Sequence, residues 1–173
     1  MLSYLQRIHI QRLTLVKKLT LQLIVVICAF TSSQTQAAGN YHVEVIVFKQ
    51  TDSLPGNRVA DFSNIPSFAS TWPSNTIYLN NYAKSIRFYQ KYQILTHTAW
   101  GQKSASYNGS AAKQLGVGGM SGYIKVFAKQ LLFADIKLNF QGHSISERRR
   151  LKLNELHYFD NQGFGVLMRV SRI

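Results

Sequence analysis

The stretch Tyr41–Lys49 reads YHVEVIVFK, and it predicts the central strand of the fold. Valine stands at positions 43, 45 and 47 of this stretch, and β-branched residues dominate it. Branched side chains favour strands because they are restricted at the first side-chain torsion and pack well on a pleated surface. The alternation and the apolar content together indicate a strand in the interior of a sheet.

More strands are predicted on the C-terminal side of this stretch. Alternation of apolar and polar residues predicts a strand over Tyr92–Gln102, two strands or one bent strand over Gly122–Phe140, a strand over Glu147–Asn154 and a last strand over Gly163–Ile173. The expected fold class is therefore α+β: a single domain over residues 38–173, dominated by an antiparallel sheet with at least one amphipathic helix across one face.

That helix is expected over Leu79–Gln90, where apolar residues recur at steps of three and four and the remaining face is basic. Asn80 or Asn81 would cap its first turn. Gln50–Asn75 contains all three prolines of the chain and many small polar residues, which predicts a loop with at most one short helical turn. Residues 103–121 are rich in Ser, Ala and Gly and predict a flexible loop.

The first 40 residues have a different character, because they contain no acidic residue. Four basic residues precede an apolar run of 12 residues, Leu19–Phe30, and small and polar residues follow it. This layout is typical of a secretory signal peptide, and as a helix the run would span only about 18 Å of a hydrocarbon core about 30 Å thick. We predict a signal peptide over residues 1–37, cleaved after Ala37. An uncleaved membrane anchor is the alternative, and bulky Ile27 argues against a lipoprotein attached through Cys28.

Composition and charge fit an exported, folded domain. The 173 residues carry 20 basic and 7 acidic side chains, a net charge of +13, with 46% hydrophobic residues and 16% charged ones. This balance excludes a disordered polycation, and a mean hydropathy of −0.09 excludes a bundle of membrane helices. Removing residues 1–37 takes away four basic and no acidic residues, which leaves 136 residues with 16 basic and 7 acidic side chains, or +9. The only cysteine is removed as well, so the mature chain cannot form a disulfide.

The densest charge lies in Glu147–Asp160, which reads ERRRLKLNELHYFD. In a strand, Arg148, Arg150 and Lys152 point to one face at steps of about 6.6–6.8 Å, and Arg149 points to the other. Such a ladder suits a row of anionic groups, and guanidinium groups bind carboxylates and phosphates through two parallel hydrogen bonds. The alternative is a solvated face, or cations paired with nearby acids (Glu147, Glu155 and Asp160).

An exported basic domain meets anionic envelope polymers rather than nucleic acid: lipopolysaccharide phosphates, lipid headgroups or the carboxylates of peptidoglycan stem peptides. Peptidoglycan also presents N-acetyl sugars, whose apolar faces can pack on aromatic rings. Candidate rings are those of Trp100, Tyr92, Tyr123 and Tyr158, with packing in the core as the alternative for each. We expect contact with the membrane only in transit, through the signal peptide.

Little in the sequence indicates catalysis. No cysteine remains after export, and none of the histidines at 42, 97, 143 and 157 stands in a metal-ligand spacing. We therefore expect no metal, no cofactor and no enzymatic activity. The carboxylates worth testing for a hydrolase of cell-wall material are those of Glu44, Glu155 and Asp160.

Four blocks of sequence resemble one family. They are Tyr41–Phe48, Tyr92–Gln102, Gly122–Leu138 and Glu147–Val170; the last contains Arg148–Arg150, then ELHYFD at 155–160 and GVL at 165–167. In these blocks, about half of the mature chain, the sequence resembles the CsiV-type peptidoglycan-binding proteins, small exported envelope proteins of Gram-negative bacteria. The resemblance implies non-catalytic binding of peptidoglycan in the periplasm.

The ligand-binding residues that we infer come from charge and aromatic placement; they are Arg148, Arg149, Arg150, Lys152, Trp100, His157 and Tyr158. The alternative function is a protein-interaction or scaffolding subunit of an envelope assembly, whose basic face docks an acidic partner.

Overall fold

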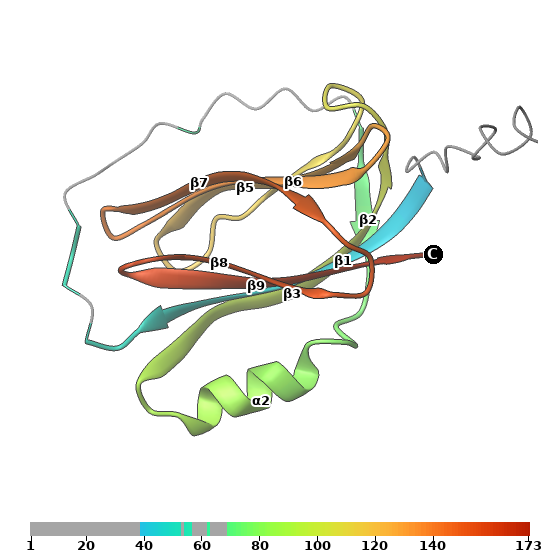
Figure 1. The fold of residues 1–173 in the computed structure, drawn as a ribbon. Helices are drawn as coiled ribbons and strands as arrows, with labels where there is room; N and C mark the ends of the chain where they lie inside the picture. The colour runs from blue at the N-terminus through green and yellow to red at the C-terminus, as the bar shows by residue number, and fades with distance from the viewer. Residues whose placement is uncertain (1–38, 53, 57–61, 63–68) are drawn as a thin grey trace, which may run out of the picture. The chain divides into compact units, whose positions relative to one another are not determined.

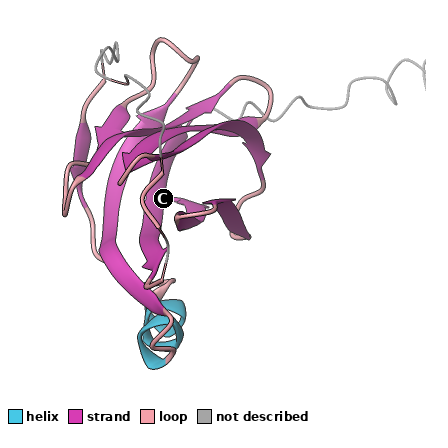
Figure 2. Cartoon of the chain, turned by 90° about the vertical axis from the view of Figure 1, so that its left-hand side faces the viewer, coloured by secondary structure: helices cyan, strands magenta, loops and turns pink. Residues whose placement is uncertain are grey.

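A computed structural model of the chain describes residues 39–52, 54–56, 62 and 69–173. In this part of the chain, two antiparallel sheets face each other, and one short helix lies on the outer side of one of them (Figures 1 and 2). We call the five-stranded sheet, with the order β2-β3-β1-β9-β8, sheet A, and the four-stranded sheet, with the order β4-β5-β6-β7, sheet B. The predicted signal peptide, residues 1–37, lies outside the described residues.

In chain order the elements are β1 (Gly39–Gln50), β2 (Thr71–Pro73), α2 (Asn80–Phe88), β3 (Tyr92–Ser104), β4 (Ala112–Gln114), β5 (Met120–Ala128), β6 (Leu132–Phe140), β7 (His143–Leu151), β8 (Leu156–Asn161) and β9 (Phe164–Arg172). The prediction of a sheet-dominated fold with an amphipathic helix is confirmed. No helix among the described residues has both the length and the apolar content needed to span a membrane.

Strand β1 occupies the centre of sheet A, as its sequence predicts. It pairs antiparallel with β3 and β9, so that Val43 lies opposite Trp100 on one side and Val170 on the other. The valines at 43, 45 and 47 are fully buried and point into the main core between the sheets. Apolar side chains of β5, β6 and β9 complete this core, and removing a large one would cost about 2–5 kcal/mol.

Helix α2 packs on the outer face of sheet A. Leu79 and Ala83 bury their side chains against Ile46 of β1 in a second, smaller apolar cluster. The helix begins at Asn80, and neither asparagine caps it: Leu79 is the cap residue, without a side-chain hydrogen bond, and Asn80 donates to the carbonyl of Thr76. A helix of nine residues is marginal on its own, so its position depends on tertiary contacts.

The structure contains more strands than the sequence predicts, and they form two sheets instead of one. Strands β2 and β4 have three residues each, too few for a periodic pattern. Strand β8 falls between the predicted strands Glu147–Asn154 and Gly163–Ile173, and only Phe159 in it is deeply buried, so it has no clear apolar alternation. Gly122–Phe140 proves to hold two strands, β5 and β6, joined by a tight turn.

Residues 103–121 also contain more structure than the predicted loop. They include the end of β3, all of β4 and the first residues of β5. Ser110 and Ala111 are fully buried, and the Ser110 hydroxyl bonds both the N–H and the carbonyl of Ala105. This contact closes the turn that follows β3.

Candidate functional site

The arginine strand is β7, which lies at one edge of sheet B. Its alternation agrees with the prediction for Arg148 and Arg150, which are exposed on the outer face of the sheet, whereas Leu151 is buried in the core. The strand ends at Leu151, however, so Lys152 lies beyond it and does not continue the ladder. The predicted row of three cations is therefore a row of two.

Arg148 has a carboxylate partner in the neighbouring strand. Its guanidinium donates to Oδ2 of Asp135 over 2.7 Å, and the Tyr107 hydroxyl donates to the same carboxylate over 2.8 Å. Asp135 is only 2% exposed, although it lies on the outer face of sheet B, because Tyr107 and Arg148 cover it. The hydrogen bond to Asp135 raises the pKa of Arg148, and burial together with the hydrogen bond to Asp135 raises the pKa of Tyr107.

Two other cations of the segment also pair locally. Arg149 forms an ion pair with Glu147 at 2.9 Å, and Lys152 forms one with Glu155 at 3.4 Å. The alternative of locally paired cations is thus correct for these two acids. Within the part of the chain that the structure describes, Arg150 has no ion-pair partner, so it is the cation of β7 most available to a ligand.

Arg149 and His157 connect the edges of the two sheets. The Arg149 guanidinium donates to the carbonyl of Tyr158 over 2.7 Å and lies above the ring of Phe159. The His157 ring contacts the backbone of Lys152. Its Nε2 atom lies 3.2 Å from the backbone nitrogen of Lys152 and 3.0 Å from the carbonyl oxygen of the same residue. These contacts hold β8 beside the end of β7, which gives His157 a structural role.

Trp100 cannot take a ligand from solvent. Its side chain is 1% exposed in the main core, and its indole N–H donates to Oε1 of Gln102 over 2.7 Å. Tyr123 is buried as well. Trp100 therefore packs in the core and we remove it from the candidate site, whereas Tyr123 is buried on the outer face of sheet B, where its side chain interacts with Tyr107.

Tyr158 borders an open pocket with a volume of about 400 Å³. Its ring is 46% exposed and lies nearly parallel to the ring of Phe48, with 6.3 Å between centroids. Both rings pass over Gly165, where an added Cβ would lie 2.9 Å from atoms of each, so the absence of a side chain there is required. Asp160 and Gln162 contribute polar groups to the pocket lining. Burial and the negative charge of Asp160 raise the pKa of the Tyr158 hydroxyl.

The arginines and this pocket are not on one face. Arg148 and Arg150 point away from the core on sheet B, whereas Tyr158 points away from the core on sheet A, opposite Leu167 of β9. The residues that we inferred to bind one ligand are thus divided between two faces that meet at the β7–β8 edge.

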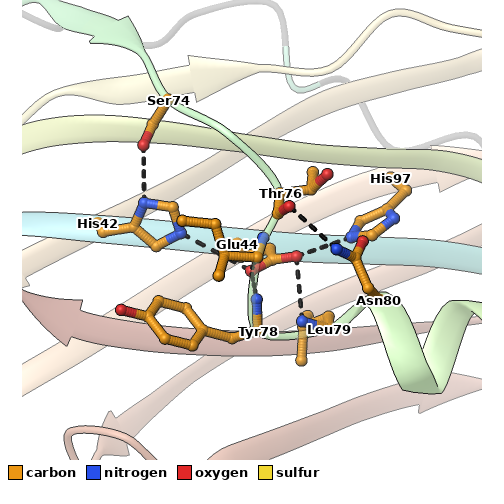
Figure 3. Close-up of polar contacts among 9 residues, drawn as sticks. His42, Glu44, Ser74, Thr76, Tyr78, Leu79, Asn80 and His97 are labelled. Carbon is orange, nitrogen blue, oxygen red and sulfur yellow. Dashed lines mark hydrogen bonds and ion pairs between the residues drawn. The ribbon is translucent and has the colours of Figure 1, made fainter.

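A buried carboxylate that the sequence analysis considered for catalysis has another role. Glu44 of β1 is fully buried and accepts hydrogen bonds from the N–H groups of residues 77, 78 and 79, at 3.1, 2.6 and 3.1 Å, and from Nε2 of His97 at 2.8 Å (Figure 3). Burial raises the pKa of Glu44, but the hydrogen bonds from His97 and the three N–H groups outweigh it, and the pKa is lowered overall. Glu44 therefore holds the segment that leads into α2.

The same part of sheet A carries further polar groups. His42 bonds the Ser74 hydroxyl through Nδ1 at 2.8 Å, while its Nε2 lies 3.7 Å from Glu44, beyond hydrogen-bonding distance (Figure 3). The arrangement has the residue types of a hydrolytic triad, but the Glu44 carboxylate is already committed to backbone groups. Among the described residues no group of three His, Cys, Asp or Glu side chains is placed to hold a metal ion.

Comparisons of the chain with protein-family models, with curated proteins and with solved structures find no match.

Proposed function

We propose that this chain is a non-catalytic protein of the bacterial periplasm that binds peptidoglycan. The observation that carries the proposal is the exposed pair of guanidinium groups on edge strand β7, in a mature chain with nine more cations than anions. The resemblance to CsiV-type proteins supports the same ligand. The predicted signal peptide would bring the chain to the compartment where this polymer lies.

The geometry of β7 suits carboxylates that are spaced along a polymer. Arg150 is free of ion pairs with described residues, and Arg148 keeps 55% of its side chain exposed although it pairs with Asp135. A guanidinium has five N–H donors, so one carboxylate partner leaves donors for a second. A hydrogen bond to a charged group contributes about 1.5–3 kcal/mol, so each arginine can supply roughly ten- to hundredfold in affinity.

Co-sedimentation with purified sacculi at low and high salt tests the proposal. We expect the wild-type protein to sediment with sacculi at low salt and to be released as salt rises, because exposed charges are screened over about 10 Å at 0.1 M. Arg150→Ala should weaken binding about tenfold. The charge-matched control is Lys84→Ala, which removes one exposed cation of α2 on the other side of the molecule.

Two results would contradict this assignment. Absence of sedimentation at low salt would remove the proposed function, and equal losses in the Arg150 variant and in the α2 control would show that only net charge matters. Arg148→Ala is less suited to the binding test, because it leaves the buried Asp135 without its guanidinium and so lowers stability.

A second candidate, an interaction subunit of an envelope assembly, is supported by the surface of α2. Phe88 is 82% exposed and Tyr89 60% exposed, beside the cations Lys84 and Arg87. Exposed aromatic rings next to cations fit an acidic protein surface. A pull-down from lysozyme-digested envelope extract tests it: we expect one stoichiometric partner that Phe88→Ser with Tyr89→Ser abolishes and Arg150→Ala does not.

A further inference from the structure

We propose that the pocket beside Tyr158 is a saccharide subsite that takes an uncharged N-acetylated amino sugar. This inference rests on the proposed function, which it divides into two places: guanidinium groups on sheet B for anionic peptide groups, and this pocket on sheet A for the glycan. The two places are on different faces, so each can be tested separately.

The first argument is that aromatic and polar side chains line the pocket together. Phe48, Phe164 and Gly165 line the pocket with apolar surface, and the half-exposed ring of Tyr158 forms part of its wall. A volume of about 400 Å³ lies in the range of about 300–1,000 Å³ that is usual for small-molecule pockets. A sugar ring and the methyl of an acetamido group can both pack on aromatic carbon.

The second argument concerns Asp160. Among the described acids, Asp135, Glu147 and Glu155 each pair with a cation, Glu44 accepts backbone N–H groups, and exposed Asp52 forms no ion pair with a described residue. Asp160 has no ion-pair partner within the described residues, although cations are in large excess in this chain. An ionised carboxylate accepts hydrogen bonds and cannot donate them, and the hydroxyl groups of a sugar are donors that it can bind.

The same carboxylate selects against other ligands. A carboxylate or phosphate group in the pocket would lie close to Asp160 and be repelled by its negative charge. The anionic groups of peptidoglycan are therefore unsuited to this pocket. Gln162, also in the lining, has an amide that both donates and accepts. Amide, carboxylate and aromatic ring together match a neutral ligand with hydroxyl and acetamido groups.

Titration with a soluble tetramer of N-acetylglucosamine, followed by calorimetry, tests the subsite, with a tetramer of glucose as the control ligand. We expect the wild-type protein to bind the first tetramer at least tenfold more tightly than the second. Tyr158→Ala and Gln162→Ala should each lower the affinity about tenfold, whereas Arg150→Ala should leave it unchanged. High salt should also leave it unchanged, because the ligand carries no charge.

Failure of this inference is distinguishable from failure of the proposed function. If sacculi bind but the N-acetylglucosamine tetramer does not, or if Gln162→Ala binds it as the wild type does, the pocket is not a saccharide subsite and the function stands. If the tetramer binds and sacculi do not, the pocket stands and the function fails. Gln162 is exposed at the surface, so its variant decides the matter even if Tyr158→Ala unfolds.

Discussion

Replacing Glu44 by glutamine should destabilise the domain strongly. The change keeps the shape of the side chain but removes its charge and replaces one acceptor oxygen by an NH₂ group. Oε2 accepts the N–H groups of Ile77 and Tyr78, and Oε1 accepts those of Leu79 and the His97 ring. In either orientation of the glutamine amide, its NH₂ group takes the place of one of these oxygens. The two groups that donated to that oxygen then face the NH₂ group, which is itself a donor.

The magnitude follows from these contacts. The least costly orientation places the NH₂ group toward His97, whose ring nitrogen can accept when it is not protonated. The Leu79 N–H then loses its partner in a fully buried place, which costs about 1–3 kcal/mol. The hydrogen bonds from the N–H groups of Ile77 and Tyr78 remain, but their acceptor is no longer charged, which weakens each by about 1 kcal/mol. The lower cost of burying a neutral group offsets part of this loss. We expect about 2–4 kcal/mol at neutral pH.

Urea unfolding followed by circular dichroism measures this difference. We expect the variant to unfold at a lower urea concentration, with the same slope of unfolding free energy against urea concentration as the wild type. Glu155→Gln is the matched control: Glu155 is exposed in its pair with Lys152, so its replacement should change the free energy of unfolding by less than about 0.5 kcal/mol. A Glu44→Gln protein as stable as the control would refute the role that we assign to Glu44.

The pH dependence gives a second check on Glu44. Its pKa in the folded protein lies below its ordinary value of 4.5, so its stabilising effect is fully present above that pH and is lost as pH falls through the lower, folded pKa. The difference in stability between wild type and Glu44→Gln should therefore shrink on acidification below about pH 4.5. A difference that grows in acid would contradict the direction of the shift.

Three further changes should separate structural residues from surface residues, each measured by urea unfolding. Arg148→Ala leaves Asp135 buried without its guanidinium and should cost about 1–3 kcal/mol, whereas Arg150→Ala should cost less than about 0.5 kcal/mol; equal effects would refute the pairing. Trp100→Phe removes the indole N–H that Gln102 accepts in the core and should cost about 1–3 kcal/mol while sacculus binding by the folded fraction is kept; lost binding would return Trp100 to the site. Gly122→Ala should cost more than about 1 kcal/mol, because Gly122 has φ +128° and an added Cβ would collide with the carbonyl of Lys137; an unchanged midpoint would count against this backbone geometry.

The parts of the fold that the sequence predicts well are those with a long local pattern. The valine alternation of β1 and the two alternating halves of Gly122–Phe140 are such patterns, and each corresponds to observed strands. Helix α2 also follows from its periodicity, apart from its cap. The cap was missed because Glu44 supplies the acceptors from 33 to 35 residues away, and no local pattern reveals such a partner.

The candidate site was predicted less well, for the same reason. The alternation placed Arg148 and Arg150 on one face correctly, but the partner of Arg148 is Asp135 on the neighbouring strand. Trp100 stands in a strand with few strongly apolar neighbours, so its pattern does not show which face is buried. The division between two sheets, which separates Tyr158 from the arginines, depends on where the chain passes from β7 to β8 across residues 152–155.

The position of β1 between β3 and β9 has a consequence for how the chain reaches its folded state. Sheet A joins its first strand to its last, so a chain that emerges with its N-terminal end first holds β1 with one open edge until β9 is available. An apolar strand with an open edge is a template for aggregation, and contacts this distant in sequence form slowly. Deletion of residues 164–173 would therefore remove β9, the strand that pairs with both β1 and β8. Closure of sheet A between β1 and β8 therefore has to wait until the residues of β9 have been synthesised.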